Sequence, residues 1–85
     1  VLNASYSDND YRPATCEAMQ EAVDAGMLVV VSAGNAASDN DARPVSPASC
    51  PSAGIITVAN STADEVLHPS SNHGARSVDL AAPGT

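Results

Sequence analysis

The stretch V-V-V-S-A-G-N, Val29 to Asn35, decides how the rest of this 85-residue sequence is interpreted. Residues 27–32 (M-L-V-V-V-S) form an apolar run without polar alternation, which is typical of a strand covered on both faces in a parallel sheet. The small residues Ala33 and Gly34 then lead into the carboxamide of Asn35. On residue chemistry alone, an Asn after Gly is typical of a turn, so a functional role for Asn35 needs further support.

The segment before this strand predicts a helix. Its apolar side chains recur at helical spacing on one face, whereas acidic and amide residues occupy the other; the apolar set is Cys16, Met19 and Val23. Pro13 suits the first turn of such a helix, and Gly26 suits a left-handed cap at its end. With residues 1–5 (V-L-N-A-S) as a first short strand, residues 1–32 read as a strand–helix–strand unit.

The rest of the chain predicts shorter elements. Residues 36–51 form a loop by composition, and such a long connection is often functional. Residues 54–59 (G-I-I-T-V-A) predict another buried strand, 60–65 a polar turn, and 77–81 a last short strand, whereas 66–72 are ambiguous. We therefore predict an α/β fold that is part of a doubly wound, mainly parallel sheet.

Composition excludes several classes of protein. The net charge is −7, with three Arg and no Lys, so the basic stripe of a nucleic-acid reader is missing and anionic membrane surfaces are disfavoured. No run approaches the roughly 20 apolar residues of a membrane span. The chain starts with Val and ends in A-P-G-T, and we expect it to be an excerpt of a longer protein.

The cysteines and the charged side chains predict no metal site. Cys16 and Cys50 match no metal-ligand spacing; we expect both to be unpaired, because a thiol on the apolar helix face behaves as a small hydrophobe. His68 and His73 lack further ligands at matching spacing. The acidic residues are better explained as a solvated rim than as a calcium cage; they are Asp39, Asp41, Asp64 and Glu65. A nucleophilic triad cannot be built either, since no G-x-S-x-G elbow is present.

Four blocks of the sequence, in order, resemble the catalytic domain of subtilisin-like serine proteases. V-L-N-A-S-Y-S is similar to V-I-N-M-S-L-G of that family, and A-V-D-A-G-M-L-V-V-V-S-A-G-N is similar to A-x-x-A-G-V-x-V-V-A-A-A-G-N. S-P-A-S-C-P-S-A-G-I-I-T-V-A-N resembles Y-P-A-x-Y-P-x-V-I-A-V-A-A, and S-S-N-H-G-A-R-S-V-D-L-A-A-P-G-T resembles F-S-N-Y-G-x-x-V-D-L-A-A-P-G. The resemblance covers the whole chain and implies that residues 1–85 are an internal fragment of one peptidase domain with a subtilisin-type sheet.

The resemblance assigns roles to residues at the exits of two predicted strands. Asn35 matches the asparagine that donates its side-chain N–H to the oxyanion, and the segment Ser5, Tyr6 and Ser7 matches the strand that pairs with the peptide substrate. Ala33 and Gly34 match the wall of the main specificity pocket. The physics agrees for Asn35, because ligands of open α/β sheets bind beyond the carboxyl ends of strands, and a neutral carboxamide stabilises a developing anion without a ground-state ion pair.

The implied activity is that of a serine endopeptidase working through an acyl-enzyme. In the family, the triad Asp and His lie upstream of these blocks and the nucleophilic Ser lies downstream, so we expect the fragment alone to be inactive. One alternative is a pseudoprotease, a catalytically inactive domain of the same fold that acts as a binding or structural domain. A nucleotide-binding α/β module is a third reading, but no G-x-G-x-x-G or P-loop follows a strand.

The resemblance also implies the setting of the site. The expected partner is a peptide or protein substrate, with neither nucleic acid nor membrane, and the expected state is a monomeric, extracellular or periplasmic protein. No cofactor is assigned for the fragment, although the full-length domain could hold structural calcium, and some relatives have a cation site made of backbone carbonyls near Ala48 and Cys50. His73 replaces a family Tyr or Phe and is read as structural. Pro47 matches a family proline that is often cis, so we expect a cis Ser46–Pro47 bond, against a background of about 5–6% for X–Pro bonds.

Overall fold

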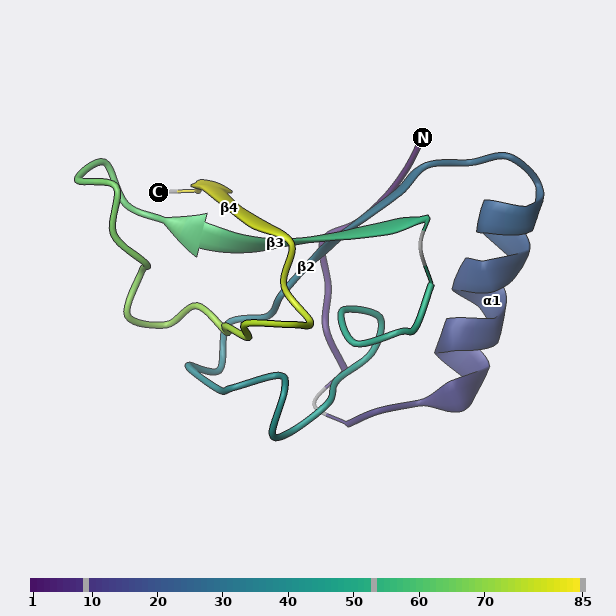
Figure 1. Cartoon of the computed structure of the whole chain (residues 1–85), viewed down its shortest axis with the longest axis horizontal. Coiled ribbons are helices and arrows are strands. Elements are labelled where there is room, and N and C mark those ends of the chain that lie inside the picture. Colours follow the sequence, from purple (N-terminus) through teal and green to yellow (C-terminus); the bar gives the residue numbers. More distant parts are fainter. Residues whose placement is uncertain (9, 53, 85) are drawn as a thin grey trace.

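The structure is a computed structural model that describes residues 1–8, 10–52 and 54–84. Its main feature is a four-stranded parallel sheet. Its strands follow the chain order β1-β2-β3-β4, and each neighbouring pair is parallel. Their bounds are β1 Leu2–Ala4, β2 Val29–Ser32, β3 Ile55–Ser61 and β4 Leu80–Pro83. The predicted α/β class with a mainly parallel sheet is confirmed (Figure 1).

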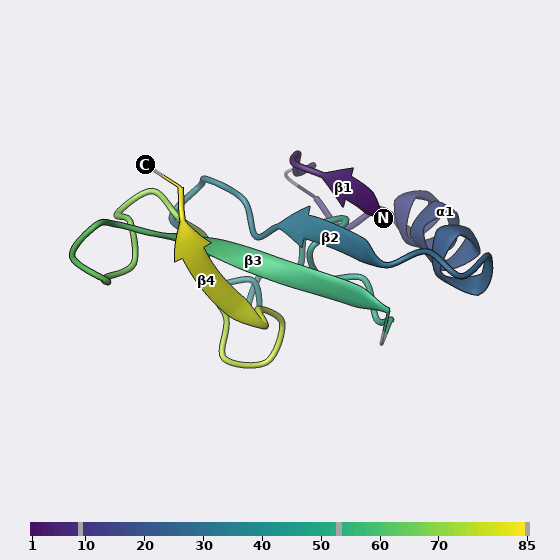
Figure 2. The same cartoon turned by 90° about the horizontal axis from the view of Figure 1, so that it is seen from above.

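The helix α1 (Pro13–Asp24) connects β1 to β2 and starts at the predicted proline. It ends where Gly26 takes a φ of +89°, a left-handed conformation that glycine adopts without a Cβ penalty. Figures 1 and 2 show α1 beside the amino-terminal ends of β2 and β3. The helix therefore leaves the opposite, carboxyl end of the sheet free.

The core lies on one face of the sheet. Val29 and Val31 of β2 are 0% and 1% exposed, whereas Val30 between them is half-buried. The buried faces of β2 and β3 pack against Met19 of α1 and against a turn in the long loop at residues 45–50. Complete burial of one such aliphatic side chain stabilises the fold by about 1.5–3 kcal/mol. The contacts on this one face of the sheet therefore supply the hydrophobic stabilisation of the described residues.

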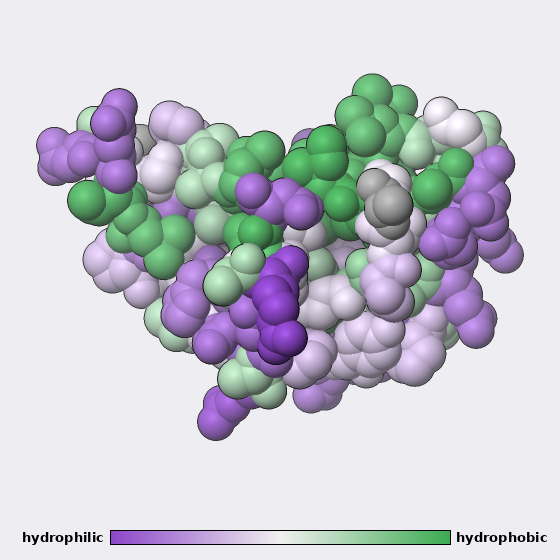
Figure 3. Space-filling model, viewed as in Figure 1, coloured by the Kyte–Doolittle hydropathy of each residue, from purple (hydrophilic) through white to green (hydrophobic). Residues whose placement is uncertain are grey.

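The other face of the sheet is uncovered by the described residues. Figure 2 shows the four strands from this side with no helix or loop crossing them, and Figure 3 shows apolar side chains gathered along the same upper side. The apolar run at 27–32 predicted a strand covered on both faces, yet Leu28 at its start is 46% exposed and Leu80 on β4 is 49% exposed. Within the described residues, only one of the two predicted layers is present.

The strand boundaries differ from the prediction by up to three residues, and the largest differences concern the last two strands. β3 continues into the predicted turn as far as Ser61, because β4 pairs with its second half from Val58↔Leu80 to Ser61↔Pro83. The last strand starts at Leu80 and not at residue 77, because Ser77 is engaged elsewhere by the carboxylate of Asp41. The ambiguous residues 66–72 are irregular, apart from an isolated bridge between Ser61 and Leu67.

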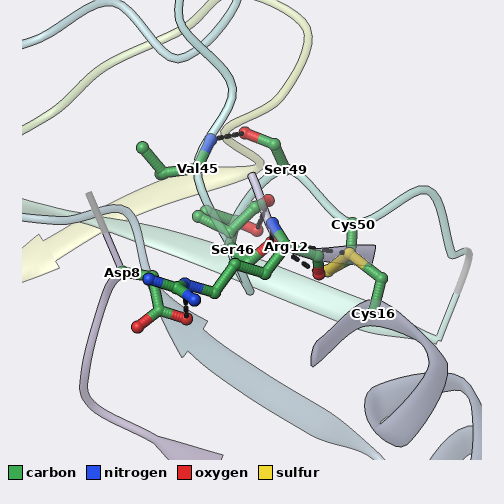
Figure 4. The surroundings of a disulfide bond; sticks show 9 residues. Asp8, Arg12, Cys16, Val45, Ser46, Ser49 and Cys50 are labelled. Carbon is green, nitrogen blue, oxygen red and sulfur yellow. Dashed lines mark hydrogen bonds and ion pairs between the residues drawn. A yellow bond between two sulfur atoms is a disulfide. The ribbon is translucent and has the colours of Figure 1, made fainter. Parts of the chain in front are cut away.

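The prediction that the two cysteines are unpaired is wrong. Cys16 and Cys50 form a disulfide, with their Cα atoms 5.2 Å apart. The long loop returns to the start of α1, where the Arg12 N–H donates to Ser46 Oγ at 2.7 Å and that hydroxyl donates to the Arg12 carbonyl at 3.2 Å (Figure 4). This contact places Cys50 against the apolar helix face that carries Cys16. The expected cis Ser46–Pro47 bond in the same turn is confirmed.

Candidate functional site

The carboxyl ends of β1 and β2 carry the six residues to which the resemblance assigns oxyanion or substrate-binding roles. β1 ends at Ala4 and β2 at Ser32, and the two strands are parallel neighbours with Ala4 paired to Val31. Their exits therefore lie at one edge of the sheet, the usual ligand-binding edge of an α/β fold. The residues brought together there are Ser5, Tyr6, Ser7, Ala33, Gly34 and Asn35.

A hollow of about 560 Å³ separates the two exits. One wall is the segment 5–7, and the other consists of Asn35 and its successors in the long loop. Asn35 and Ser5 also line a second hollow of about 420 Å³ on the open face of the sheet, together with Ala33 and Gly34. Asn35 is exposed, whereas Ala33 and Gly34 are buried, so its carboxamide stands between the two hollows on a buried support.

Two buried amide side chains hold the turn at residues 33–38. Asn72 Oδ1 accepts hydrogen bonds from the backbone N–H groups of Ala36 (2.8 Å) and Ser38 (3.1 Å). Asn72 Nδ2 donates to Asn40 Oδ1 at 3.0 Å, and Asn40 Nδ2 donates to the Ala33 carbonyl at 2.9 Å. The backbone N–H of Asn72 donates to the Gly34 carbonyl at 2.8 Å. Hydrogen bonds therefore hold the backbone both before and after Asn35.

Gly34 allows this close packing. Its φ is +109°, and a Cβ at this position would lie 2.6 Å from Asn72 Nδ2 and 3.3 Å from Ser7 Oγ. Both the backbone conformation and the missing side chain therefore require glycine here. The resemblance assigns Gly34 to the wall of a specificity pocket; in the structure it is the point where the turn contacts the side chain of Asn72.

The long loop completes the hollow and carries its charge. Val45 and Arg43 line the hollow, and Arg43 is the one ionised side chain among the described residues that do so. The Asp8 N–H donates to the Ser46 carbonyl at 2.9 Å, which joins the segment after β1 to the same loop. A guanidinium and several hydroxyl and amide groups thus surround the hollow.

A carboxylate fastens the far side of the long loop. Asp41 accepts hydrogen bonds from the Ser77 hydroxyl at 2.7 Å, from the Arg76 N–H at 3.1 Å and from the Ser77 N–H at 2.9 Å. The Ser77 hydroxyl bond contributes most to a lowered pKa of Asp41, followed by the Arg76 N–H, since both favour the ionised carboxylate. This contact keeps residues 36–41 beside the segment that supplies Asn72.

The backbone carbonyls of Ala48 and Cys50 each accept a hydrogen bond within the chain. The Ala48 carbonyl accepts a hydrogen bond from the Thr57 hydroxyl at 2.9 Å, and the Cys50 carbonyl accepts one from the Ser52 N–H at 2.9 Å. Within residues 1–8, 10–52 and 54–84, no group of three His, Cys, Asp or Glu side chains suits a metal ion. No helix in these ranges is long and apolar enough to cross a bilayer.

Sequence reasoning missed three residues of the site. Arg43 and Asn40 lie in a loop without periodicity, so nothing in the sequence predicts where their side chains point. Asn72 belongs to the S-N-H-G block, which contributed to the resemblance but received no role. Ser71 and Asn72 are adjacent polar residues, and each is only 2% exposed. Their burial becomes visible only in the folded chain.

Known proteins resemble this chain in both sequence and structure. The profile of the Subtilase family matches residues 1–85. Subtilisin-like protease 3 of Trichophyton equinum is 41% identical over the whole chain, which covers 20% of that protein, and alkaline protease 1 of Emericella nidulans is 47% identical over 75 residues, 87% of the chain and 17% of that protein. The chain spans about a fifth of the length of these relatives. The crystal structure of a cold-adapted subtilisin-like serine proteinase superimposes with a TM-score of 0.86 at 34% identity, covering 98% of this chain and 28% of that one.

Proposed function

Because this chain belongs to the subtilase family, we propose that it forms the oxyanion-binding and substrate-binding part of a serine endopeptidase domain. The domain would hydrolyse peptide bonds through an acyl-enzyme, with the Asp, His and Ser of the triad supplied by residues outside these 85. One observation carries the proposal: the exposed carboxamide of Asn35 stands at the carboxyl end of β2 on a buried, hydrogen-bonded turn.

Asn35 is the oxyanion donor in this proposal. The side-chain hydrogen bonds of the turn reach Ala33, Ala36 and Ser38, and among the described residues none of them uses the Asn35 carboxamide. Its N–H is therefore available to the carbonyl oxygen of a substrate as that oxygen gains negative charge. A preorganised neutral donor stabilises this charge in the transition state without binding the ground state tightly.

The segment 5–7 is the strand partner of the substrate. It follows the edge strand β1, which pairs on one side with β2 among the described residues. An extended peptide could add to this edge through backbone hydrogen bonds and place one side chain in the hollow between Tyr6 and Ala36. Ala33 and Gly34 supply the buried floor behind Asn35, so a peptide backbone can approach the turn closely.

The proposed protease function also implies an extracellular or periplasmic location. The Cys16–Cys50 disulfide supports it, because disulfides persist in oxidising compartments and are rare in reducing ones. We propose that the protein acts outside the cytoplasm on peptide or protein substrates.

Replacement of Asn35 in the complete protease domain tests the proposal. Asn35→Ala is expected to lower kcat with little change in KM. Removal of an oxyanion-hole donor in a member of this same family lowers kcat by about 10²–10³, and we expect a loss of this size. Asn35→Asp is expected to be worse than Ala, because a carboxylate repels the oxyanion in a sheltered site. Steady-state kinetics on a chromogenic peptide, with unfolding temperatures measured in parallel, provide the readout.

The turn interpretation of Asn35 predicts a different pattern. If Asn35 only shapes the corner, Asn35→Gly should be tolerated, and any loss in Asn35→Ala should appear as a lower unfolding temperature with kcat retained. A folded complete domain that hydrolyses no peptide and fails to react with a serine-directed phosphonate would instead support the alternative of an inactive binding domain.

A further inference from the structure

We infer that the buried pair Asn72 and Asn40 is the device that positions Asn35 for oxyanion stabilisation. This inference rests on the proposed function of Asn35 and goes beyond it, because neither residue lies in the part of the turn that would meet the oxyanion. Both are positioning residues: they act on the reacting atoms through the backbone of the turn at residues 33–38.

Burial makes the pair a specific structural feature. Asn40 and Asn72 are 1% and 2% exposed, so their four polar side-chain atoms have given up water. Such groups are costly unless they are hydrogen bonded, and here both carboxamides are bonded at both ends. An apolar side chain of similar size would fill the same volume at lower desolvation cost, so volume alone does not explain the amides.

The donors and acceptors of the pair can be arranged in one way only. Backbone N–H groups donate and cannot accept, so the N–H groups of Ala36 and Ser38 require an oxygen from Asn72. The Nδ2 of Asn72 must then face the Oδ1 of Asn40, and the Nδ2 of Asn40 faces the Ala33 carbonyl. This chain of bonds ties the residue two positions before Asn35 to the residues one and three positions after it.

The consequence for Asn35 is an exposed side chain on a backbone that is held by hydrogen bonds on both sides. The Gly34 carbonyl is held as well, by the N–H of Asn72 at 2.8 Å, so the peptide units on both sides of Asn35 are fixed from one buried residue. A displacement of about 1 Å at a catalytic group can cost roughly 10²-fold in rate. The amide pair therefore fixes the turn at residues 33–38, and with it the position from which Asn35 donates.

A double-mutant cycle in the complete protease domain tests this role. Asn72→Ala alone is expected to lower kcat about 10-fold or more with KM little changed. In the Asn35→Ala background, the same substitution is expected to lower kcat by less than about twofold, because the group that it positions is already absent. Thr57→Val is the matched control: it removes one buried hydrogen bond, to the Ala48 carbonyl, and is expected to lower the unfolding temperature while kcat is retained.

Equal losses from Asn72→Ala in the two backgrounds, or an unchanged kcat in the single variant, would overturn the inference. If Asn72→Ala does not fold, Asn72→Asp enters the same cycle, since it keeps an acceptor for Ala36 and Ser38 but loses the donor to Asn40. The outcomes also separate the two claims. An unchanged kcat in Asn35→Ala removes the proposed function itself, whereas a fall in Asn35→Ala without one in Asn72→Ala removes the positioning role alone.

Discussion

Two glycines with positive φ offer a matched test of the close contact beneath the site. Gly26 caps α1 with a φ of +89° and has no atom within 4 Å of an added Cβ. Gly34 has a φ of +109°, and an added Cβ would lie 2.6 Å from Asn72 Nδ2 and 3.2 Å from its Cγ. Alanine at either position meets similar backbone strain, but only at Gly34 does it meet a buried side chain.

The structure gives different costs for the two changes. A left-handed backbone costs an L-residue about 1–2 kcal/mol, which is the whole expected loss for Gly26→Ala. In Gly34→Ala the new methyl group must displace the Asn72 amide, which is bonded to Ala36, Ser38 and Asn40 and cannot move freely. Loss of one buried partner adds about 1–3 kcal/mol, for a total of about 2–5 kcal/mol.

The kinetic consequences should differ as well. Displacement of Asn72 shifts the turn at 33–38, so kcat of Gly34→Ala should fall about 10-fold or more, whereas Gly26→Ala should keep its kcat. The assay compares kcat on a chromogenic peptide with apparent unfolding temperatures of the phosphonate-blocked complete domain at one scan rate, since such temperatures depend on the rate. Equal losses of stability and activity in both variants would refute the reasoning, because the contact with Asn72 would then have no effect.

Two further predictions concern the long loop. The disulfide joins residues 34 positions apart, so the double variant Cys16→Ala, Cys50→Ala should have a free energy of unfolding lower by about 3–4 kcal/mol, from the loss of the loop constraint on the unfolded chain. Thiol titration of the unreduced, denatured chain should find close to zero free thiols, and two free thiols would contradict the bond. Asp41 has a pKa below its ordinary 3.8, so its contribution to stability is present above that pH and is lost as pH falls through the lowered value. Asp41→Asn should therefore lower the unfolding temperature at neutral pH, with the gap to wild type narrowing below pH 3.8; a constant gap would show that the charge is not responsible.

Local patterns were sufficient to predict the elements. The helical spacing of Met19 with its apolar neighbours, the proline at 13 and the cap at Gly26 concern residues within a few positions of one another. The apolar runs before Ala33 and at residues 54–59 predicted parallel strands for the same reason. The boundaries at Ser61 and Leu80 were missed because they depend on pairing between β3 and β4, which the local composition does not record.

In the candidate site, too, local sequence predicted some features and the tertiary structure decided others. Gly34 and Asn35 were identified from their position after a buried strand and from the family blocks, and the structure places them at the expected edge of the sheet. The Cys16–Cys50 bond was predicted wrongly, because the contact between Arg12 and Ser46 that brings the two thiols together spans 34 residues.

What the sequence determined by itself was the type and order of the elements and the residues that leave the strands, since these follow from spacing and backbone preference along the chain. What only the tertiary structure decided was which distant polar groups meet. Asn40 and Asn72 are separated by 32 residues, yet they share one hydrogen bond beneath Asn35. The physical reason is that burial removes water as a partner, so each amide must bind whichever group the completed fold places beside it.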